Sequence, residues 1–204
     1  SPVTIKAAVS SSCYGTCRLT IYGTNPTALS LSNPGTLIAE GSGAQINATF
    51  TPSNHRSAIT WSSSEPQVAR VNSSGYVTPQ NTGKTTITAR TANGLTATTT
   101  VEVREPSFTV TGSSPTNNSS DVDVLTSCSV TFSLPIHLSS NISDAKLTGG
   151  GSQVKGQLTY SGNTVTFIPE KALSPHTNYT WVIPKGVVLN KWDTSSPAFQ
   201  LTFT

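Results

Sequence analysis

Residues 59–78, ITWSSSEPQVARVNSSGYVT, decide the fold of this chain. The segment that ends with Trp61 and the serines after it alternates apolar and polar residues, as a strand does. Pro66 ends this strand, because proline fixes φ and has no N–H to donate. A short apolar run around Ala69 and a turn at Gly75 lead into another strand. A large aromatic residue followed by two short β segments predicts the centre of a β-sandwich.

The same stretch resembles the bacterial Ig-like group 2 family, whose pattern reads roughly tWsSsnpsvAtVdssGlVt. The matching positions are Trp61, Ser63, Pro66, Val68, Ala69, Val71, Gly75 and Val77. The resemblance covers residues 26–104, with Gly83–Ala89 as the family's GtatItA segment. It implies an immunoglobulin-like sandwich in which Trp61, Val68, Val71 and Gly75 belong to the core. Members of this family are mostly repeats in secreted or surface-bound bacterial proteins.

Residues 105–204 resemble a second bacterial Ig-like family, the one found in S-layer proteins. The matching positions are Pro115, Val122, Phe132, Ser133, Gly162, Asn163, Thr164, Phe167, Pro169, Leu173, Pro175 and Tyr179. The family's late D..GN motif is replaced here by LNKWD at residues 189–193, so no ion site is carried over. Alternation within the strands places Phe132, Phe167, Tyr179 and Trp181 in the predicted core.

The composition supports an all-β chain with uncharged polar faces. Serine and threonine together number 63 of 204 residues, and only 10% of the residues are charged. Threonine favours strands and serine favours turns. A mucin-like disordered stalk is also rich in both, but here the apolar residues are periodic and make up 34% of the chain. We therefore expect two tandem immunoglobulin-like β-sandwiches, at residues 26–104 and 105–204, after an N-terminal β-hairpin at residues 1–25.

Charge and hydropathy exclude two classes of partner. The net charge is +3, and no basic run with interleaved aromatic residues provides the electrostatic footprint of nucleic-acid binding. No apolar run approaches the roughly 18 residues of a membrane span, so contact with a membrane is expected only through parts outside this segment. The absence of methionine, even at position 1, suggests a piece of a longer polypeptide.

The N-terminal hairpin contains the pair Cys13 and Cys17, which we predict to form a disulfide. A Cys-x3-Cys loop closes a tight ring, and such a bond implies an oxidising compartment. A metal half-site and a redox motif are the rival interpretations, but finger-like ligand spacing and a βαβ context are both lacking. Cys128 is in phase with Val130 on its strand, which predicts a buried, inert thiol. Whether the hairpin belongs to a preceding domain stays open.

Residues with catalytic or metal-binding potential are scattered. His55, His137 and His176 each lie in a separate loop-like context, and the chain has no Gly-x-Ser-x-Gly elbow. Asp121 and Asp123 are spaced like a fragment of a calcium loop, but its glycine and distal glutamate are missing. We therefore predict no catalytic residues, no metal site and no cofactor.

A second apparent motif has a simpler explanation. The sequence Gly83-Lys84-Thr85 mimics the end of a phosphate-binding loop, but Thr78 stands where the first glycine is required. The stretch also reads as a strand, whereas that loop joins a strand to a helix. We interpret it as the residues of an ordinary turn.

Two tryptophans are candidates for a contact with a ligand. Trp181 and Trp192 could form an exposed pair that stacks on carbohydrate. Trp181 lies in an alternating strand, which favours a core position. Trp192 lies in a polar loop and is the better candidate for a surface contact.

The sequence predicts a non-enzymatic segment of a large bacterial surface or secreted protein. The domains would act as spacers and as adhesion or cell-contact modules. We expect this segment to be a monomer. The expected partner is a protein or glycan on another cell surface, because Ser/Thr/Asn/Gly-rich end loops offer neutral hydrogen bonds. The rival hypotheses are an accessory region of a secreted polysaccharide-degrading enzyme and a decoration module of a phage virion.

Overall fold

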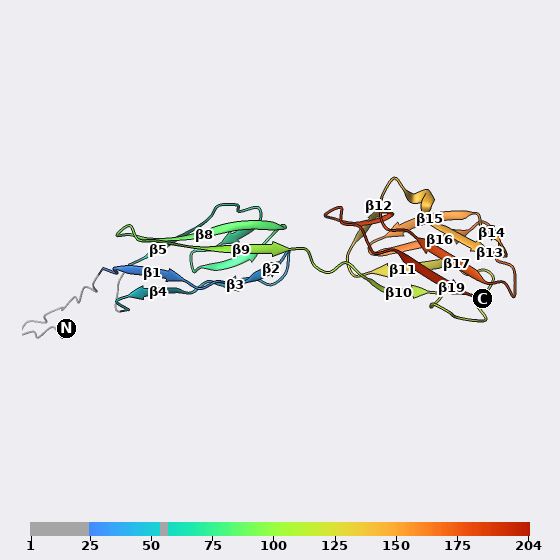
Figure 1. Ribbon diagram of the computed structural model, residues 1–204, viewed down its shortest axis with the longest axis horizontal. Coiled ribbons are helices and arrows are strands. Elements are labelled where there is room, and N and C mark those ends of the chain that lie inside the picture. Colours follow the sequence, from blue (N-terminus) through green and yellow to red (C-terminus); the bar gives the residue numbers. More distant parts are fainter. Residues whose placement is uncertain (1–24, 54–56) are drawn as a thin grey trace, which may run out of the picture. The chain divides into compact units, whose positions relative to one another are not determined.

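The computed structural model describes residues 25–53 and 57–204, and the chain divides into two compact units, the first ending at Glu105 and the second beginning at Pro106 (Figure 1). The predicted hairpin, its Cys13–Cys17 disulfide and His55 lie outside the described residues. All of the described regular structure is β-strand except one 3-10 helix, η1 (Ile142–Asp144). This confirms the prediction of an all-β chain with two sandwiches.

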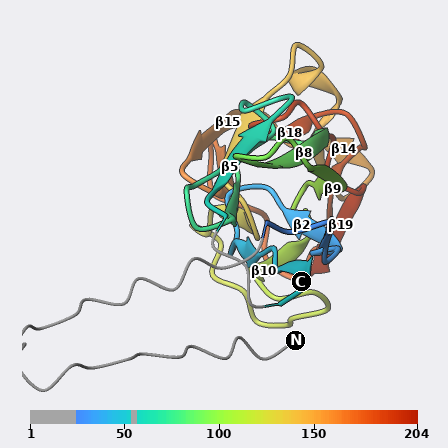
Figure 2. The same cartoon turned by 90° about the vertical axis from the view of Figure 1, so that its left-hand side faces the viewer.

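The first unit is built from a four-stranded sheet, a three-stranded sheet and a two-stranded pair. The four-stranded sheet runs in the order β2 (Thr36–Ile38), β9 (Thr96–Arg104), β8 (Gly83–Thr91) and β5 (Ile59–Ser63). The three-stranded sheet runs in the order β3 (Ala44–Gln45), β7 (Tyr76–Pro79) and β6 (Ala69–Val71). The pair consists of β1 (Ala28–Leu31) and β4 (Ala48–Thr51). Figure 2 shows this unit from its end.

The longest hairpin, β8–β9, turns at an Asn-Gly dipeptide, a strong signal for a hairpin. Its turn contains Asn93 and Gly94, and Gly94 has a φ of 93°, a conformation that glycine adopts at little cost. The Thr91 hydroxyl donates to the Asn93 side-chain oxygen at 2.6 Å, and the Asn93 side-chain Nδ2 donates to the Pro26 carbonyl at 2.9 Å. Before this turn, β8 alternates from Thr85 onward, with Thr85, Ile87, Ala89 and Thr91 buried. The turn therefore fixes the register that places these residues in the core.

Residues 44–50 do not form the single strand that their alternation suggests. After β3 the Ile46 amide continues the pairing toward β7, because it donates to the Gly75 carbonyl at 3.0 Å. The Asn47 amide then donates to the Ser32 hydroxyl at 2.9 Å, and β4 begins. Because β3 pairs with β7 and β4 pairs with β1, the segment changes partner between the two halves. Ile46, at the break, is buried.

The core of the first unit differs from the predicted one at two positions. The buried apolar residues are Leu37, Ala39, Ile46, Val68, Ala69, Val77, Ile87, Ala89, Val101 and Val103. Gly75 is also buried, but Trp61 and Val71 are only half-buried. Trp61 lies on β5 and Val71 on β6, and each strand is at the edge of its sheet. An edge strand has a neighbour on one side only, so these side chains keep some contact with solvent.

The second unit contains two four-stranded sheets and a two-stranded pair. One sheet runs in the order β10 (Val110–Ser114), β11 (Cys128–Phe132), β16 (Thr164–Pro169) and β15 (Gly156–Ser161). The other runs in the order β14 (Ser152–Gln153), β13 (Lys146–Gly149), β17 (Tyr179–Ile183) and β19 (Phe199–Phe203). The pair is β12 (Ile136–Leu138) with β18 (Val188–Asn190). One hydrophobic cluster, which includes Phe132 and Trp181, fills this unit.

Cys128 lies in that cluster and is fully buried. Burial raises the pKa of its thiol from an ordinary 9.0 to about 12, because the thiolate would lose its solvation. The unfolded chain releases this proton at lower pH than the folded chain does. The thiol therefore stabilises the fold fully below pH 9, and this contribution is lost between pH 9 and about 12.

We expect Cys128 to resist labelling in the native protein at pH 8 and to react once the chain is unfolded, since only the thiolate is nucleophilic. Alkylation followed by peptide mapping measures this thiol separately from Cys13 and Cys17. Rapid native modification of the Cys128 peptide would contradict the position of β11 in the core.

Candidate functional site

The aromatic residues predicted for the second core lie together in the interior rather than on a surface. Phe132 and Trp181 are fully buried, and Phe167 and Tyr179 are nearly so. The ring centroids of Phe167 and Trp181 are 6.4 Å apart, and those of Tyr179 and Phe203 are 5.3 Å apart. These contacts give Trp181 a packing role, so it does not form an exposed pair with Trp192.

Trp192 lies in a short loop that follows β18, and a buried side chain forms hydrogen bonds with the backbone of this loop. The Asn190 side-chain oxygen accepts the backbone N–H groups of Trp192, at 2.9 Å, and Thr194, at 3.0 Å. Asn190 is fully buried, so the bonds fix this loop to the core. Trp192 itself is half-buried, and the Lys191 ammonium lies 4.4 Å from the centroid of its ring. A contact role for Trp192 stays a prediction, and the ammonium lies over one face of the ring.

The same loop contacts the β12 strand through the side chains of Asp193 and His137. His137 Nε2 lies 3.1 Å from Asp193 Oδ1, and the two side chains are 38% and 81% exposed. An exposed pair of this kind contributes little to stability. His176 is elsewhere, on a different loop, so the structure does not gather the described histidines into one site.

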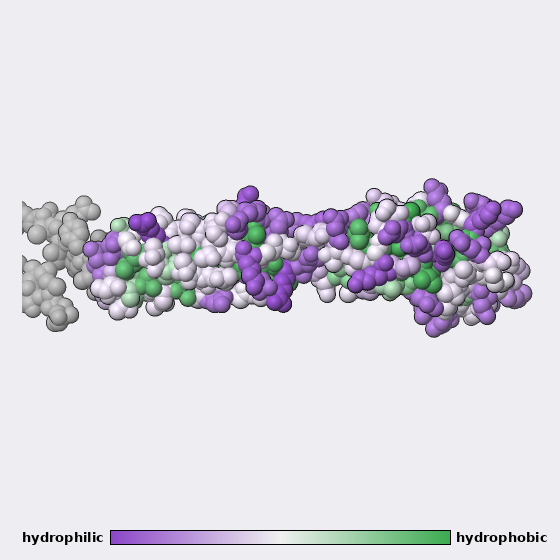
Figure 3. Space-filling model, turned by 45° about the horizontal axis from the view of Figure 1, so that its top comes forward, coloured by the Kyte–Doolittle hydropathy of each residue, from purple (hydrophilic) through white to green (hydrophobic). Residues whose placement is uncertain are grey.

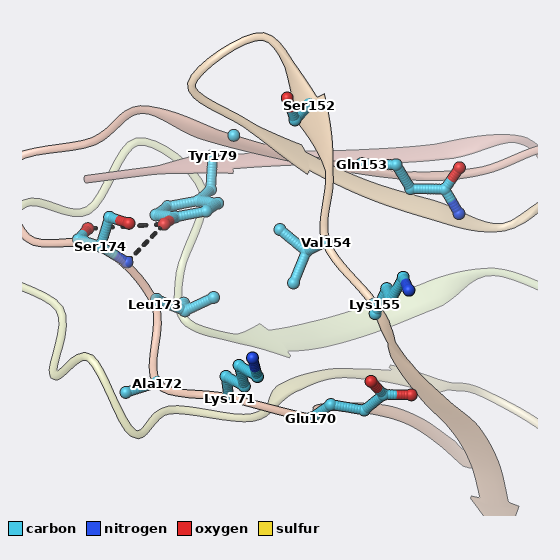
Figure 4. Close-up of a pocket in the computed structure, with 11 residues that line it drawn as sticks. Ser152, Gln153, Val154, Lys155, Glu170, Lys171, Ala172, Leu173, Ser174 and Tyr179 are labelled. Carbon is cyan, nitrogen blue, oxygen red and sulfur yellow. Dashed lines mark hydrogen bonds between the residues drawn. The ribbon is translucent and has the colours of Figure 1, made fainter.

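A hollow that the sequence did not predict opens beside the β13–β14 turn (Figure 4). Its volume is about 360 Å³. The lining residues come from the β13–β14 hairpin and the two residues after it, from the segment between β16 and β17, and from the start of β17. They are Gly149, Ser152, Gln153, Val154, Lys155, Glu170, Lys171, Ala172, Leu173, Ser174 and Tyr179. We call this space the β13–β14 hollow. Its charged groups are two lysines and one glutamate.

Tyr179 closes one side of the hollow in a fixed orientation. Its hydroxyl accepts the Ser174 amide at 2.7 Å and lies 3.4 Å from the Ser174 carbonyl (Figure 4). The ring lies so close to Gly149 that a Cβ atom at that position would overlap Tyr179 Cε1. Glycine at position 149 therefore lets the turn approach the ring. No sequence motif marks this arrangement, because it depends on two segments that meet only in the fold.

The acidic residues do not assemble into a metal centre in the part of the chain that the structure describes, where no group of three or more His, Cys, Asp or Glu side chains could hold an ion. Asp123 instead accepts the Leu125 amide at 2.8 Å, as in a turn. Glu102 has a lowered pKa because Arg104 donates a hydrogen bond to it at 3.0 Å.

No described helix is long and apolar enough to cross a membrane.

Comparison with known families gives two matches along the chain. Residues 27–103 match the model of the bacterial Ig-like domain (group 2), and residues 104–204 match a second bacterial Ig-like domain model. The two matches are consecutive and leave only the first 26 residues unmatched.

One similar protein is the lacto-N-biosidase of Bifidobacterium bifidum, which is 38% identical over 77 residues. The matched segment makes up 38% of this chain and 7% of that protein, so the chain spans a small part of its relative.

Among solved structures, domains 5-6 of the S-layer protein SbsC match with 16% identity and a TM-score of 0.34, over 88% of this chain and 98% of that one. Protocadherin gamma B7 cadherin domains 1-4 match with 12% identity and a TM-score of 0.36, over 90% and 51% of the two chains. The assignment rests on the family models, not on these two structures.

Proposed function

We propose a non-catalytic role for this chain, which belongs to the bacterial Ig-like domains, with a group 2 domain at residues 27–103 and a second domain at residues 104–204. The observation that supports the proposal is the way in which the two units are built. Each one has its own apolar core and presents loops at its ends, where sandwiches usually carry function. The chain would act as a spacer and contact module of a larger bacterial surface or secreted protein.

The chemistry of the exposed strands supports a role in contact. On β9 the outward residues Thr96, Thr98 and Thr100 are exposed, and on β5 Thr60 and Ser62 are exposed. Much of the surface in Figure 3 is pale, the colour of intermediate hydropathy, as these residue types predict. Neutral hydroxyls of this kind can form many hydrogen bonds without charge. The partner that we propose is a protein or glycan on another cell.

A second candidate role follows from the relative with 38% identity. Lacto-N-biosidase is named as an enzyme, and a segment of it resembles part of this chain. This chain would then be an accessory, non-catalytic region of a secreted enzyme that acts on glycans. The sequence that flanks this segment in its gene distinguishes the two roles. A catalytic domain there favours the accessory role, and an array of similar domains with an anchor favours the adhesive one.

Two assays on the 204-residue chain test the proposal. We expect no release of reducing ends from a panel of polysaccharides, because acid–base catalysis needs positioned proton donors and acceptors. The β13–β14 hollow has one carboxylate and no histidine, and the three titratable residues that line another hollow, Asp121, Asp123 and His176, are all exposed to solvent. We expect measurable binding of the labelled chain to cells. Turnover of any polysaccharide by the purified chain would overturn the non-catalytic role.

The contact role has its own control. Trp192→Ala is expected to reduce cell binding, whereas Tyr160→Ala, at a tyrosine that is 49% exposed in the same unit, is expected to leave it unchanged. Equal losses in both variants would show that any exposed aromatic residue matters and would contradict a specific contact at Trp192.

A further inference from the structure

The chain enters and leaves the first unit at opposite ends of strand β9. The Asn93 side chain, in the turn just before β9, donates to the Pro26 carbonyl at 2.9 Å, so the entering chain lies beside the start of this strand. The chain leaves at Arg104, the last residue of β9. Because β9 has 9 residues, entry and exit are about 30 Å apart along it. A pull between these two points therefore acts along the direction of β9.

An early strand of the first unit is joined to the end of β9 and runs the same way. β2 pairs with β9 in parallel, with Leu37 in register with Val103 and Ile38 in register with Arg104. The Ala39 amide extends the pairing, because it donates to the Arg104 carbonyl at 2.8 Å. Figure 1 shows β1, which precedes β2, running in the direction of β9 as well. We call these bonds the β2–β9 patch. Leu37, Ala39 and Val103 are buried, so the patch is anchored in the core.

The second unit repeats this arrangement with different residues. Ser119 forms a parallel bridge with Phe203, the last residue of β19. The Asn118 amide donates to the Thr202 carbonyl at 2.7 Å, and the Thr204 amide donates to the Ser119 carbonyl at 3.0 Å. We call these bonds the β19 patch. Phe203 is buried, so this patch is also anchored in a core. Each unit thus ties an early segment to the end of its last strand.

Two asparagine side chains reinforce the β19 patch. Asn117 Oδ1 accepts the backbone N–H of Thr202 at 2.9 Å and its hydroxyl at 3.3 Å. The Thr202 hydroxyl also donates to Asn118 Oδ1 at 2.7 Å. Both asparagines are exposed, so they contribute these hydrogen bonds and not packing in the core.

The parallel direction decides how the two patches respond to force. A pull on the ends of a unit moves its early segment toward the N-terminus and its last strand toward the C-terminus. Parallel strands then slide past each other, and the bonds between them are loaded together. In an antiparallel hairpin pulled at its open end, the bonds break one pair after another. Forced unfolding depends on the rate of unfolding, which is lower when several bonds must break at once.

The strands that come before the patches do not remove this resistance. β1 pairs with β4, and β10 pairs with β11, so neither strand takes part in a patch. If a pull releases β1 or β10 first, the β2–β9 patch and the β19 patch are still closed. The patches are therefore the bonds that the force meets next in each unit.

We propose that each unit bears tension along the chain, and that the β2–β9 patch and the β19 patch are the parts that resist it. This inference rests on the spacer role proposed above and adds a mechanical function to it. A spacer between a cell and a bound partner is pulled whenever the two move apart. Resistance of this kind is kinetic, so the free energy of unfolding does not measure it.

The first test pulls the 204-residue chain by its two ends at constant force and tells the units apart by the length of chain that each releases. The double variant Asn117→Ala/Thr202→Val removes three hydrogen bonds of the β19 patch. We expect its second unit to unfold about tenfold or more faster at the same force, as the loss of several bonds implies.

The matched control for this variant is Asn163→Ala/Thr131→Val. It removes side-chain hydrogen bonds of the same kinds from the β15–β16 turn and from β11, outside the patch. We expect its unfolding rate under force to stay close to that of the unchanged chain. Urea unfolding of both double variants gives their equilibrium losses, with which the rates are compared.

The second test changes the direction of the pull on the first unit. Handles attached through Asn25→Cys and Arg104→Cys, at exposed positions, load the β2–β9 patch along its strands. Handles attached through Asn81→Cys and Arg104→Cys pull the β8–β9 hairpin apart from its open end. Both chains carry Cys13→Ser and Cys17→Ser, so that the handles attach only at the new cysteines. We expect the unit to unfold at a lower force in the second direction.

Three results would overturn the proposal. These are an unchanged rate in Asn117→Ala/Thr202→Val, equal acceleration in this variant and its control, and equal unfolding forces in the two directions of pull. The measurements involve neither turnover nor cell binding. The units can therefore fail to resist tension while the non-catalytic contact role stands, and the contact role can fail without a change in these forces.

Discussion

Trp181→Ala is expected to lower the free energy of unfolding of the second unit by about 3–5 kcal/mol, the usual cost of removing a large aromatic side chain from a core. Trp181 is fully buried at the centre of β17, in register with Leu147 on one side and Leu201 on the other. Its ring also contacts Phe167 and Phe199, with centroids 6.4 and 6.1 Å away. The neighbours belong to separate strands of both sheets and cannot collapse together into the space that the indole leaves.

The indole nitrogen does not add to this cost. Trp181 Nε1 is buried with no hydrogen-bond partner among the described residues, so the substitution breaks no bond of the side chain. The loss comes from packing and from the cavity, which increases with the volume left unfilled. Trp181→Phe, which keeps part of the ring volume, should therefore recover part of the stability.

Urea unfolding followed by probes in each unit measures the effect. We expect the transition of the second unit to move to lower urea and that of the first unit to stay in place, because each has its own core. The control is Trp192→Ala, at a half-buried tryptophan of the same unit, with a smaller loss. A shared shift of both transitions would contradict independent cores.

The sequence predicted those parts of the fold that depend on local alternation and turn chemistry. The inward residues of β11 and the turn at Gly75 were visible in the pattern, because side chains in a strand point alternately to opposite faces and glycine suits a turn. The stretch that contains Ile46 also alternates, yet it is divided between β3 and β4. Ile46 still bonds to Gly75 next to β7, whereas Asn47 bonds to Ser32 next to β1, and both partners are distant in the sequence.

The sequence could not predict how far residues at sheet edges are buried or what shape the hollow has. The physical reason is the same for both. The pattern around Trp61 shows that it faces inward but not that β5 has a neighbour on one side only. Lys155 and Lys171 are separated by a hairpin and acquire a common environment only when Glu170 bonds to the Lys155 carbonyl. Periodicity reports the face on which a residue lies, whereas a site depends on which segments meet.

Gly75→Ala is expected to destabilise the first unit by about 2–5 kcal/mol, from two separate causes. Gly75 has a φ of 84°, and an L-residue in the left-handed region costs roughly 1–2 kcal/mol. In addition, a Cβ atom there would lie 2.7 Å from Trp61 Cζ2 and 3.0 Å from the Ile46 carbonyl oxygen. That carbonyl is backbone and the indole is packed, so neither yields easily, and overpacking of this kind costs about 1–3 kcal/mol.

Gly94→Ala separates the two causes. Gly94 has a φ of 93°, but a Cβ atom at this position would have no neighbouring atom within 4 Å, so the variant should show the backbone cost alone. The difference between the two variants, measured as free energies of unfolding of the first unit, then reports the contact with Trp61 and the Ile46 carbonyl. Equal losses at both positions would show that the indole moves aside without cost.

A double-mutant cycle identifies the partner. If the Trp61 ring causes the clash, Gly75→Ala should cost less in a Trp61→Ala background, and the interaction energy of neighbouring residues is commonly about 0.5–3 kcal/mol. If the Ile46 carbonyl causes it, the two substitutions should be additive. Additivity would also remove the reason to pair tryptophan at position 61 with glycine at position 75, because either residue could then change without the other.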